Sequence, residues 1–132
     1  MIQNLMFGTE KQQLEVIKLF RQHLSKQPNL FEDIRRGIVS KFVDFLRGGN
    51  INLQYETALA LSSITHGNSL HTKCVVDAGA LPVLIQLLST PSENVQKEAA
   101  NCLSNIARNG SESRDLVLDH GILSSLSQYV FN

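Results

Sequence analysis

The stretch Glu56–Ile64 reads ETALALSSI, and it returns later in the chain as Glu98–Ile106, which reads EAANCLSNI. Leu61 and Leu103 hold the same place in the two copies and are 42 residues apart (103 − 61). A period of about 40–47 residues is typical of arrays of helical repeats, in which each unit buries its apolar face only against its neighbours. The sequence therefore predicts an all-α solenoid.

A second block of sequence keeps the same period. A glycine precedes an apolar segment at Gly37, Gly79 and Gly121, so successive glycines are again 42 residues apart (79 − 37 and 121 − 79). A more divergent copy of the first block lies at Leu14–Phe20. Because two independent blocks share one period, we infer that the repeat runs through most of the chain.

Local signals divide one repeat into three helices. A short helix is expected from Asn68-Ser69 to Asp77, where Gly79 follows its end as a C-terminal glycine does. Pro82 then lies in the first turn of a middle helix, a position where its missing N–H costs nothing. Ser92 is expected to cap a long third helix that runs to about Arg108. Its predicted buried face consists of Val95, Ala99, Cys102, Leu103 and Ile106.

The period also predicts how the chain is organised. In the first repeat, Arg35-Arg36 is expected to end a short helix, and Gly37 is expected to separate it from the next helix as Gly79 does. The predicted parts are an N-terminal extension (1–9) and one repeat domain (10–132), the latter holding a lone long helix (10–25), full repeats at about 30–66 and 69–108, and a partial repeat (112–131).

Composition excludes several classes of function. The 132 residues are 42% hydrophobic and 18% charged, which is typical of a globular chain. The 12 Lys and Arg residues balance 12 Asp and Glu residues, whereas nucleic-acid-binding domains are usually basic. No stretch approaches the 18 consecutive apolar residues of a membrane span. Neither nucleic acid nor a membrane is therefore an expected partner.

The reactive side chains form no catalytic or metal-binding pattern. Asp119-His120 has no strand and sharp turn presenting a nucleophile beside it. Cys74 and Cys102 lie in apolar helical patterns and are expected to be buried, reduced thiols. The histidines are scattered with no second ligand at metal spacing: His23, His66, His71 and His120. We expect no enzyme activity, no metal and no cofactor.

Several segments resemble the importin-α family: Glu56–Gly67, Thr72-Lys73, Val75–Pro82, Cys102–Ala107 and Arg114–Leu118. The resemblance runs from about Gln12 over nearly the whole chain and corresponds to the first three and a half armadillo repeats of that family. It implies a right-handed superhelical armadillo solenoid with the long third helices on its concave side. It also implies a location in the cytoplasm and nucleus.

Importin-α proteins carry nuclear-import cargo, so the resemblance implies a groove for an extended, Lys/Arg-rich localisation signal. Each family repeat places a Trp on the long helix to enclose Lys stems, and an Asn four residues later to bond the peptide backbone. The two pairs are here Leu59 with Ser63 and Asn101 with Asn105, so only Asn105 matches. The family's acidic residue after the third long helix is here Asn109. The remaining groove positions implied by the resemblance are Leu24, Lys26, Gly67 and Thr72.

The sequence thus predicts an importin-α-like adaptor for proteins carrying Lys/Arg-rich localisation signals, with a groove degraded because the chain contains no Trp. Importin-β is not expected to bind through this chain, since the basic N-terminal segment of the family is absent from the sequence. The alternative is an armadillo scaffold without a transport role, or a truncated regulator that makes protein–protein interactions.

The two ends of the predicted array lack one neighbour each. Their apolar stripes are expected to be exposed, and exposed apolar patches favour association. We therefore expect self-association through Leu14, Ile17, Phe20 and Leu24 at one end and Ile122, Leu126 and Val130 at the other.

Overall fold

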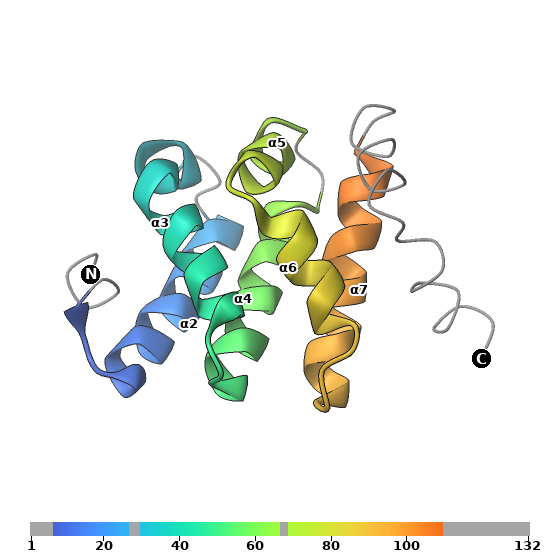
Figure 1. Ribbon diagram of the computed structural model, residues 1–132. Coiled ribbons are helices and arrows are strands. Elements are labelled where there is room, and N and C mark those ends of the chain that lie inside the picture. The colour runs from blue at the N-terminus through green and yellow to red at the C-terminus, as the bar shows by residue number, and fades with distance from the viewer. Residues whose placement is uncertain (1–6, 27–29, 67–68, 110–132) are drawn as a thin grey trace.

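The computed structural model describes residues 7–26, 30–66 and 69–109, and the side chains of these residues except 24–26, 30–36 and 69. Every regular element in these ranges is an α-helix, labelled as in Figure 1. The helices are α2 (Glu10–Lys26), α3 (Leu30–Arg47), α4 (Ile51–Ile64), α5 (Ser69–Asp77), α6 (Ala80–Leu87) and α7 (Glu93–Arg108).

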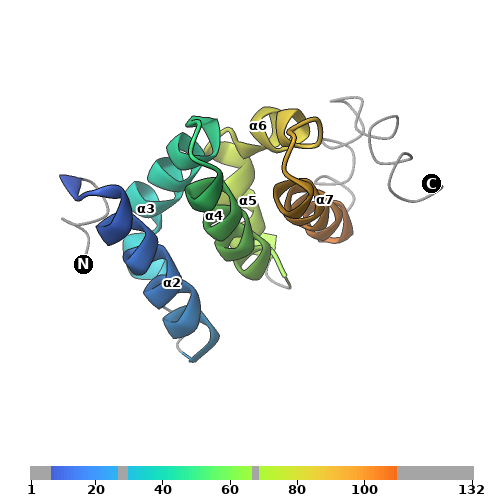
Figure 2. The ribbon, with the colours of Figure 1, turned by 90° about the horizontal axis from the view of Figure 1, so that it is seen from below.

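The helices form two layers. The long helices α2, α4 and α7 make one row, in which α4 packs against both of the others. Helices α3 and α6 lie on the other side of this row, as the view from below in Figure 2 shows. The short helix α5 packs against α3, α4 and α6, and its axis bends by 81° into that of α6. The chain thus returns to the α2/α4/α7 row once in each repeat.

Short polar side chains determine where the long helices begin. Thr9 and Gln12 form a reciprocal capping box at α2, since each side-chain oxygen accepts the other residue's backbone N–H, at 3.2 and 3.0 Å. Asn50 Oδ1 accepts the N–H of Leu53 at the start of α4. Ser92 Oγ accepts the N–H of Val95 at the start of α7, where the sequence predicted a cap.

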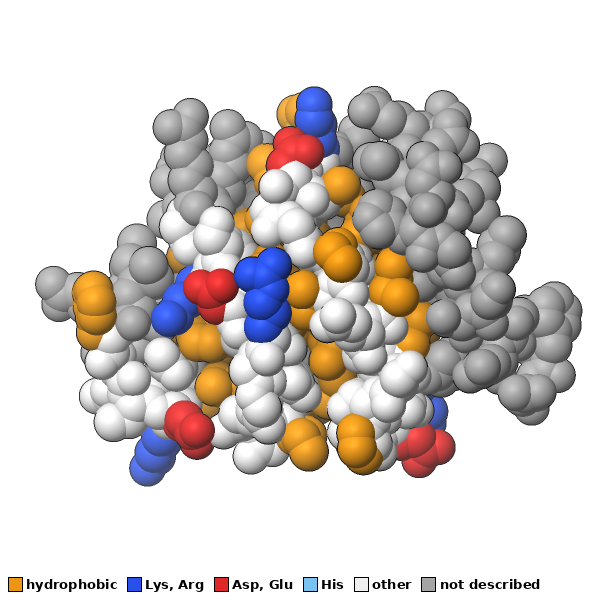
Figure 3. All heavy atoms as spheres, viewed as in Figure 1, with side chains coloured by type: hydrophobic (Ala, Val, Ile, Leu, Met, Phe, Trp, Pro, Cys, Tyr) orange, Lys and Arg blue, Asp and Glu red, His pale blue; other side chains and the backbone are white. Residues whose placement is uncertain are grey.

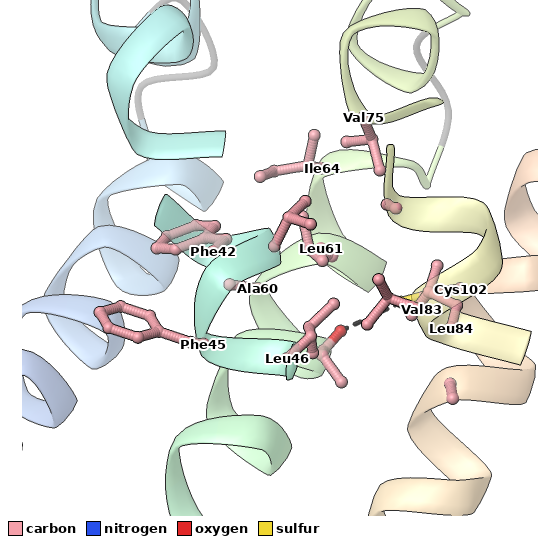
Figure 4. Close-up of a cluster of buried hydrophobic side chains, with 14 of the residues drawn as sticks. Phe42, Phe45, Leu46, Ala60, Leu61, Ile64, Val75, Val83, Leu84 and Cys102 are labelled. Atoms are coloured by element: carbon pink, nitrogen blue, oxygen red, sulfur yellow. Dashed lines mark hydrogen bonds between the residues drawn. The ribbon is translucent and has the colours of Figure 1, made fainter. Parts of the chain in front are cut away.

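The core runs continuously between the two layers. Phe20 of α2 meets Phe42 of α3 edge to face, with ring centroids 5.5 Å apart. Figure 4 shows Leu61 and Ile64 of α4 among the side chains that α3, α5, α6 and α7 contribute. The predicted buried face of α7 is confirmed, because all five residues are fully buried: Val95, Ala99, Cys102, Leu103 and Ile106.

The predicted break at Gly37 is wrong. Helix α3 continues through Arg35-Arg36 and Gly37, whereas Gly79 separates α5 from α6 with a φ of +87°. The next few residues after each glycine explain the difference. Pro82 has no backbone N–H with which to continue the hydrogen bonds of α5. None of residues 38–40 is proline, so each of them has a backbone N–H that can continue the helix after Gly37.

The predicted exposed stripe on α2 is also wrong for the side chains that the structure describes. Ile17 and Phe20 are fully buried and Leu14 is half-buried, because this face of α2 packs on α3 and α4. Among the described side chains of α2, the large apolar one that is exposed is Leu19. Leu24 and the stripe from Ile122 to Val130 lie outside the described side chains, and self-association stays a prediction.

Among the described residues, no single helix is long and apolar enough to cross a membrane. The bent pair Leu70–Asp77 and Ala80–Leu87 reaches the required length and apolar content only when its two helices are taken together.

Alanine at the two glycines should change stability in opposite directions. Gly37→Ala should stabilise the protein by about 0.5–1 kcal/mol, because Gly37 is inside a helix and an added Cβ meets no atom within 4 Å. Gly79→Ala should destabilise it by about 1–2 kcal/mol, because the positive φ strains any residue with a Cβ. Urea unfolding followed by circular dichroism measures both; a loss of stability in Gly37→Ala would contradict the continuous α3.

Candidate peptide-binding face

Five of the predicted groove positions have described side chains, and four of them lie on neighbouring helices of one layer. Leu59 is half-buried and Ser63 is exposed on α4. Asn101 is exposed on α7, whereas Asn105, one turn later, is only 6% exposed. Thr72 is fully buried on α5. Residue Gly67 and the side chains of Leu24 and Lys26 lie outside the part that the structure describes.

The two long helices approach closely because small residues line their contact. Ala58 on α4 and Ala99 and Cys102 on α7 are all fully buried. Cys102 Sγ donates a hydrogen bond to the Ala58 carbonyl at 3.2 Å. Burial, with the Glu98 carboxylate adding to it, raises the pKa of the Cys102 thiol well above its usual range. Cys102 is therefore an inert packing residue.

Asn105 uses its amide to join α7 to the end of α4. Its Nδ2 donates to the Ser62 carbonyl at 3.0 Å and lies 3.3 Å from Ser62 Oγ and 3.4 Å from Thr65 Oγ1. Its Oδ1 accepts a hydrogen bond from Arg108 Nη2. A residue that the resemblance assigned to peptide binding thus has both ends of its amide engaged inside the protein.

Thr65 is the centre of this polar cluster, and it is not among the groove positions that the sequence predicted. Its carbonyl accepts hydrogen bonds from Asn109 Nδ2 at 2.6 Å and from Thr72 Oγ1 at 3.5 Å. Its hydroxyl donates to the Leu61 carbonyl at 2.9 Å. The 42-residue period could have identified Thr65, because Thr65 is equivalent to Ala107 one repeat later. A polar side chain at a position that is apolar in the next repeat indicates a hydrogen-bond partner in that repeat.

Charge is sparse at the end of the row where this cluster lies. Arg21 of α2 and Glu56 of α4 form an ion pair at 3.1 Å, with Glu56 only 14% exposed, so that carboxylate is already neutralised within the row. Between Leu59 and His66, and between Asn101 and Asn109, Arg108 is the one Lys, Arg, Asp or Glu residue. The C-terminal parts of α4 and α7 therefore offer hydroxyls, amides and one guanidinium group.

The opposite face has a different character. Figure 3, viewed from the side of α3, α5 and α6, shows apolar side chains along the seams between helices and scattered charges of both signs. A hollow of about 370 Å³ lies between α3 and α5, and half-buried Cys74 lines it, so the prediction of a buried thiol is only partly met there. Over the described ranges, no cluster of three or more His, Cys, Asp or Glu side chains could hold a metal ion.

Both the sequence and the fold of this chain match known proteins. Residues 68–108 match the sequence profile of the Armadillo/beta-catenin-like repeat family. Importin subunit alpha-1b of Oryza sativa subsp. japonica is 41% identical over 96 residues, which are 70% of this chain and 18% of that protein. Importin subunit alpha of Saccharomyces cerevisiae is 42% identical over 95 residues, again 70% of this chain and 18% of the relative.

Solved structures share the fold over almost the whole chain. A crystal structure of an engineered protein superposes with a TM-score of 0.88 at 34% identity, covering 96% of this chain and 53% of that one. A designed armadillo repeat protein in complex with the peptide (KR)4 also gives a TM-score of 0.88, at 26% identity over 96% of this chain and 54% of its own.

Together these features define an all-α armadillo-repeat solenoid, as the sequence predicted. Within that class the chain is similar in sequence to importin subunits alpha, and it spans less than a fifth of the length of these two importin relatives. It is an importin-α-like armadillo-repeat chain.

Alanine substitutions at Asn101 and Asn105 should show which of these two asparagines of α7 stabilises the fold. Asn105→Ala should destabilise the protein by about 1–3 kcal/mol, because buried polar groups around Ser62 and Thr65 lose their partner. Asn101→Ala, on the exposed side of the same helix, should change stability by no more than about 0.5 kcal/mol. Urea unfolding of both variants measures this difference, and equal stabilities would contradict a structural role for Asn105.

Proposed function

We propose that this chain binds an extended segment of a partner protein across the α2/α4/α7 row, and that the segment is a Lys/Arg-rich localisation signal held with low affinity. The observation that carries the proposal is the repeated pair on neighbouring helices, Leu59 with Ser63 and Asn101 with Asn105. Side chains at the same place in successive repeats can follow an extended peptide at regular intervals. The designed armadillo protein in complex with (KR)4 shares this arrangement of helices.

The low affinity follows from the side chains at these positions. Leu59 has apolar bulk but no aromatic face to attract a Lys ammonium group. Ser63 is short, and its Oγ already donates to the Leu59 carbonyl at 3.2 Å. Asn101 cannot enclose an aliphatic stem, and the amide of Asn105 is engaged within the protein. Since each 1.4 kcal/mol is tenfold in affinity, loss of two aromatic contacts of about 1–3 kcal/mol leaves a weak complex.

Binding of such a segment would allow the chain to carry cargo between cytoplasm and nucleus, which is the role that the resemblance to importin-α implies. An armadillo scaffold without a transport role is the competing function. The internal hydrogen bonds of Asn105 favour it, because they use a group that peptide binding would need.

Restoring the family's side chains should restore binding. The triple variant Leu59→Trp, Ser63→Asn and Asn101→Trp should bind the (KR)4 peptide at least tenfold more tightly than the natural chain, because each restored contact contributes about 1 kcal/mol or more. Isothermal titration calorimetry measures both affinities.

Ile51→Trp is the matched control, since Ile51 is an exposed apolar residue at the other end of α4. It should leave the affinity for (KR)4 unchanged. If the triple variant and the natural chain bind the peptide equally, this face is not the binding surface and the scaffold function takes precedence.

A further inference from the structure

We propose that Arg108 determines the specificity of one end of this face: it selects a carboxylate-bearing peptide side chain there and rejects Lys or Arg. The inference rests on the proposed function, because it requires that a peptide binds across α4 and α7. We call this end the C-terminal patch and define it as residues 63–66 and 104–109, which lie beyond Leu59 and Asn101, the two positions where the proposed segment places its Lys or Arg stems.

The charges of the C-terminal patch favour an acidic ligand. Arg108 is exposed, and within the part of the chain that the structure describes it forms no ion pair. The nearest carboxylate along α7 is the half-buried Glu98, ten residues before Arg108. A peptide ammonium or guanidinium group would therefore meet a like charge with no carboxylate of the patch to offset it.

The acceptors that would attract a cation are already occupied. Helices α4 and α7 both end in this patch, and the carbonyls at helix C-termini favour positive charge. Arg108 itself bonds Asn105 Oδ1. Asn109 Nδ2 bonds the carbonyls of Thr65 and Asn105, at 2.6 and 2.7 Å. Arg108 and Asn109 thus occupy the oxygen acceptors that a Lys or Arg side chain of the peptide would need.

The guanidinium group of Arg108 is suited to bind a carboxylate. A guanidinium carries five N–H donors in a planar fork, and among the described residues Arg108 donates one hydrogen bond, to Asn105. The remaining donors allow bidentate pairing with an Asp or Glu side chain. Ser104 lies one turn before Arg108 on α7 and is exposed, so its hydroxyl can bond a peptide backbone beside the cation. Charge complementarity therefore selects an acidic side chain at this position.

The test uses the full chain with fluorescein-labelled (KR)4 and (DE)4 peptides, followed by fluorescence anisotropy at low and high salt. Arg108→Glu should tighten binding of (KR)4 at least tenfold and weaken binding of (DE)4 at least tenfold. Arg108→Gln should change both affinities in the same directions by less. The differences should shrink at high salt, since exposed charges are screened.

Arg47→Glu is the charge-matched control, because Arg47 ends α3 at the opposite edge of the stack from the end of α7 (Figure 1). It should leave the ratio of the two affinities within threefold of the natural chain. Thermal melts by circular dichroism establish that each variant is folded. The neutral Arg108→Gln keeps the test valid if Arg108→Glu does not fold.

Three results would overturn the inference. If peptides bind but neither substitution of Arg108 changes the ratio of affinities, Arg108 does not set specificity and the proposed function stands. If Arg47→Glu shifts the ratio as much as Arg108→Glu does, net charge alone is responsible. If neither peptide binds the natural chain or any variant, the proposed function fails together with the inference.

Discussion

The close contact of each long helix with the long helix of the next repeat is the constraint on which the rest of this structure depends. Fully buried small residues, Ala58 on α4 and Ala99 and Cys102 on α7, let the two backbones approach until Cys102 Sγ reaches the Ala58 carbonyl. A bulkier residue at this seam would separate the helices and tilt every following repeat, because each unit packs only on its neighbours. The 42-residue period repeats this contact along the chain.

At this contact between α4 and α7, the fold and the proposed peptide binding require the same polar side chains. At its C-terminal end, Ser62 and Thr65 on α4 need hydrogen-bond partners, since buried polar groups are costly when unsatisfied. Asn105 and Asn109 of α7 supply those bonds. An amide that spans two helices is no longer available to an extended peptide. The armadillo fold of this chain therefore presents a face on which Asn105 and Asn109 form hydrogen bonds inside the protein.

Much of the architecture can be predicted from the sequence alone. The two blocks sharing one period, the cap at Ser92 and the Gly79–Pro82 boundary correctly predict an all-α solenoid and the limits of α5 and α7. The failure at Gly37 has a local reason. Glycine permits a break but does not enforce one, and no proline follows it to stop the hydrogen bonding of α3.

Sequence also determined the identity of the side chains at the face, including the absence of Trp and the presence of Arg108 in the C-terminal patch. Only the tertiary structure decided what those side chains touch. Asn101 and Asn105 are equivalent by helical spacing, yet one is exposed and the other is bonded to α4. Residues more than 40 positions apart make these bonds, so their partners depend on how two helices are rotated against each other. Helical periodicity fixes the face of a residue, whereas packing between repeats fixes its partners.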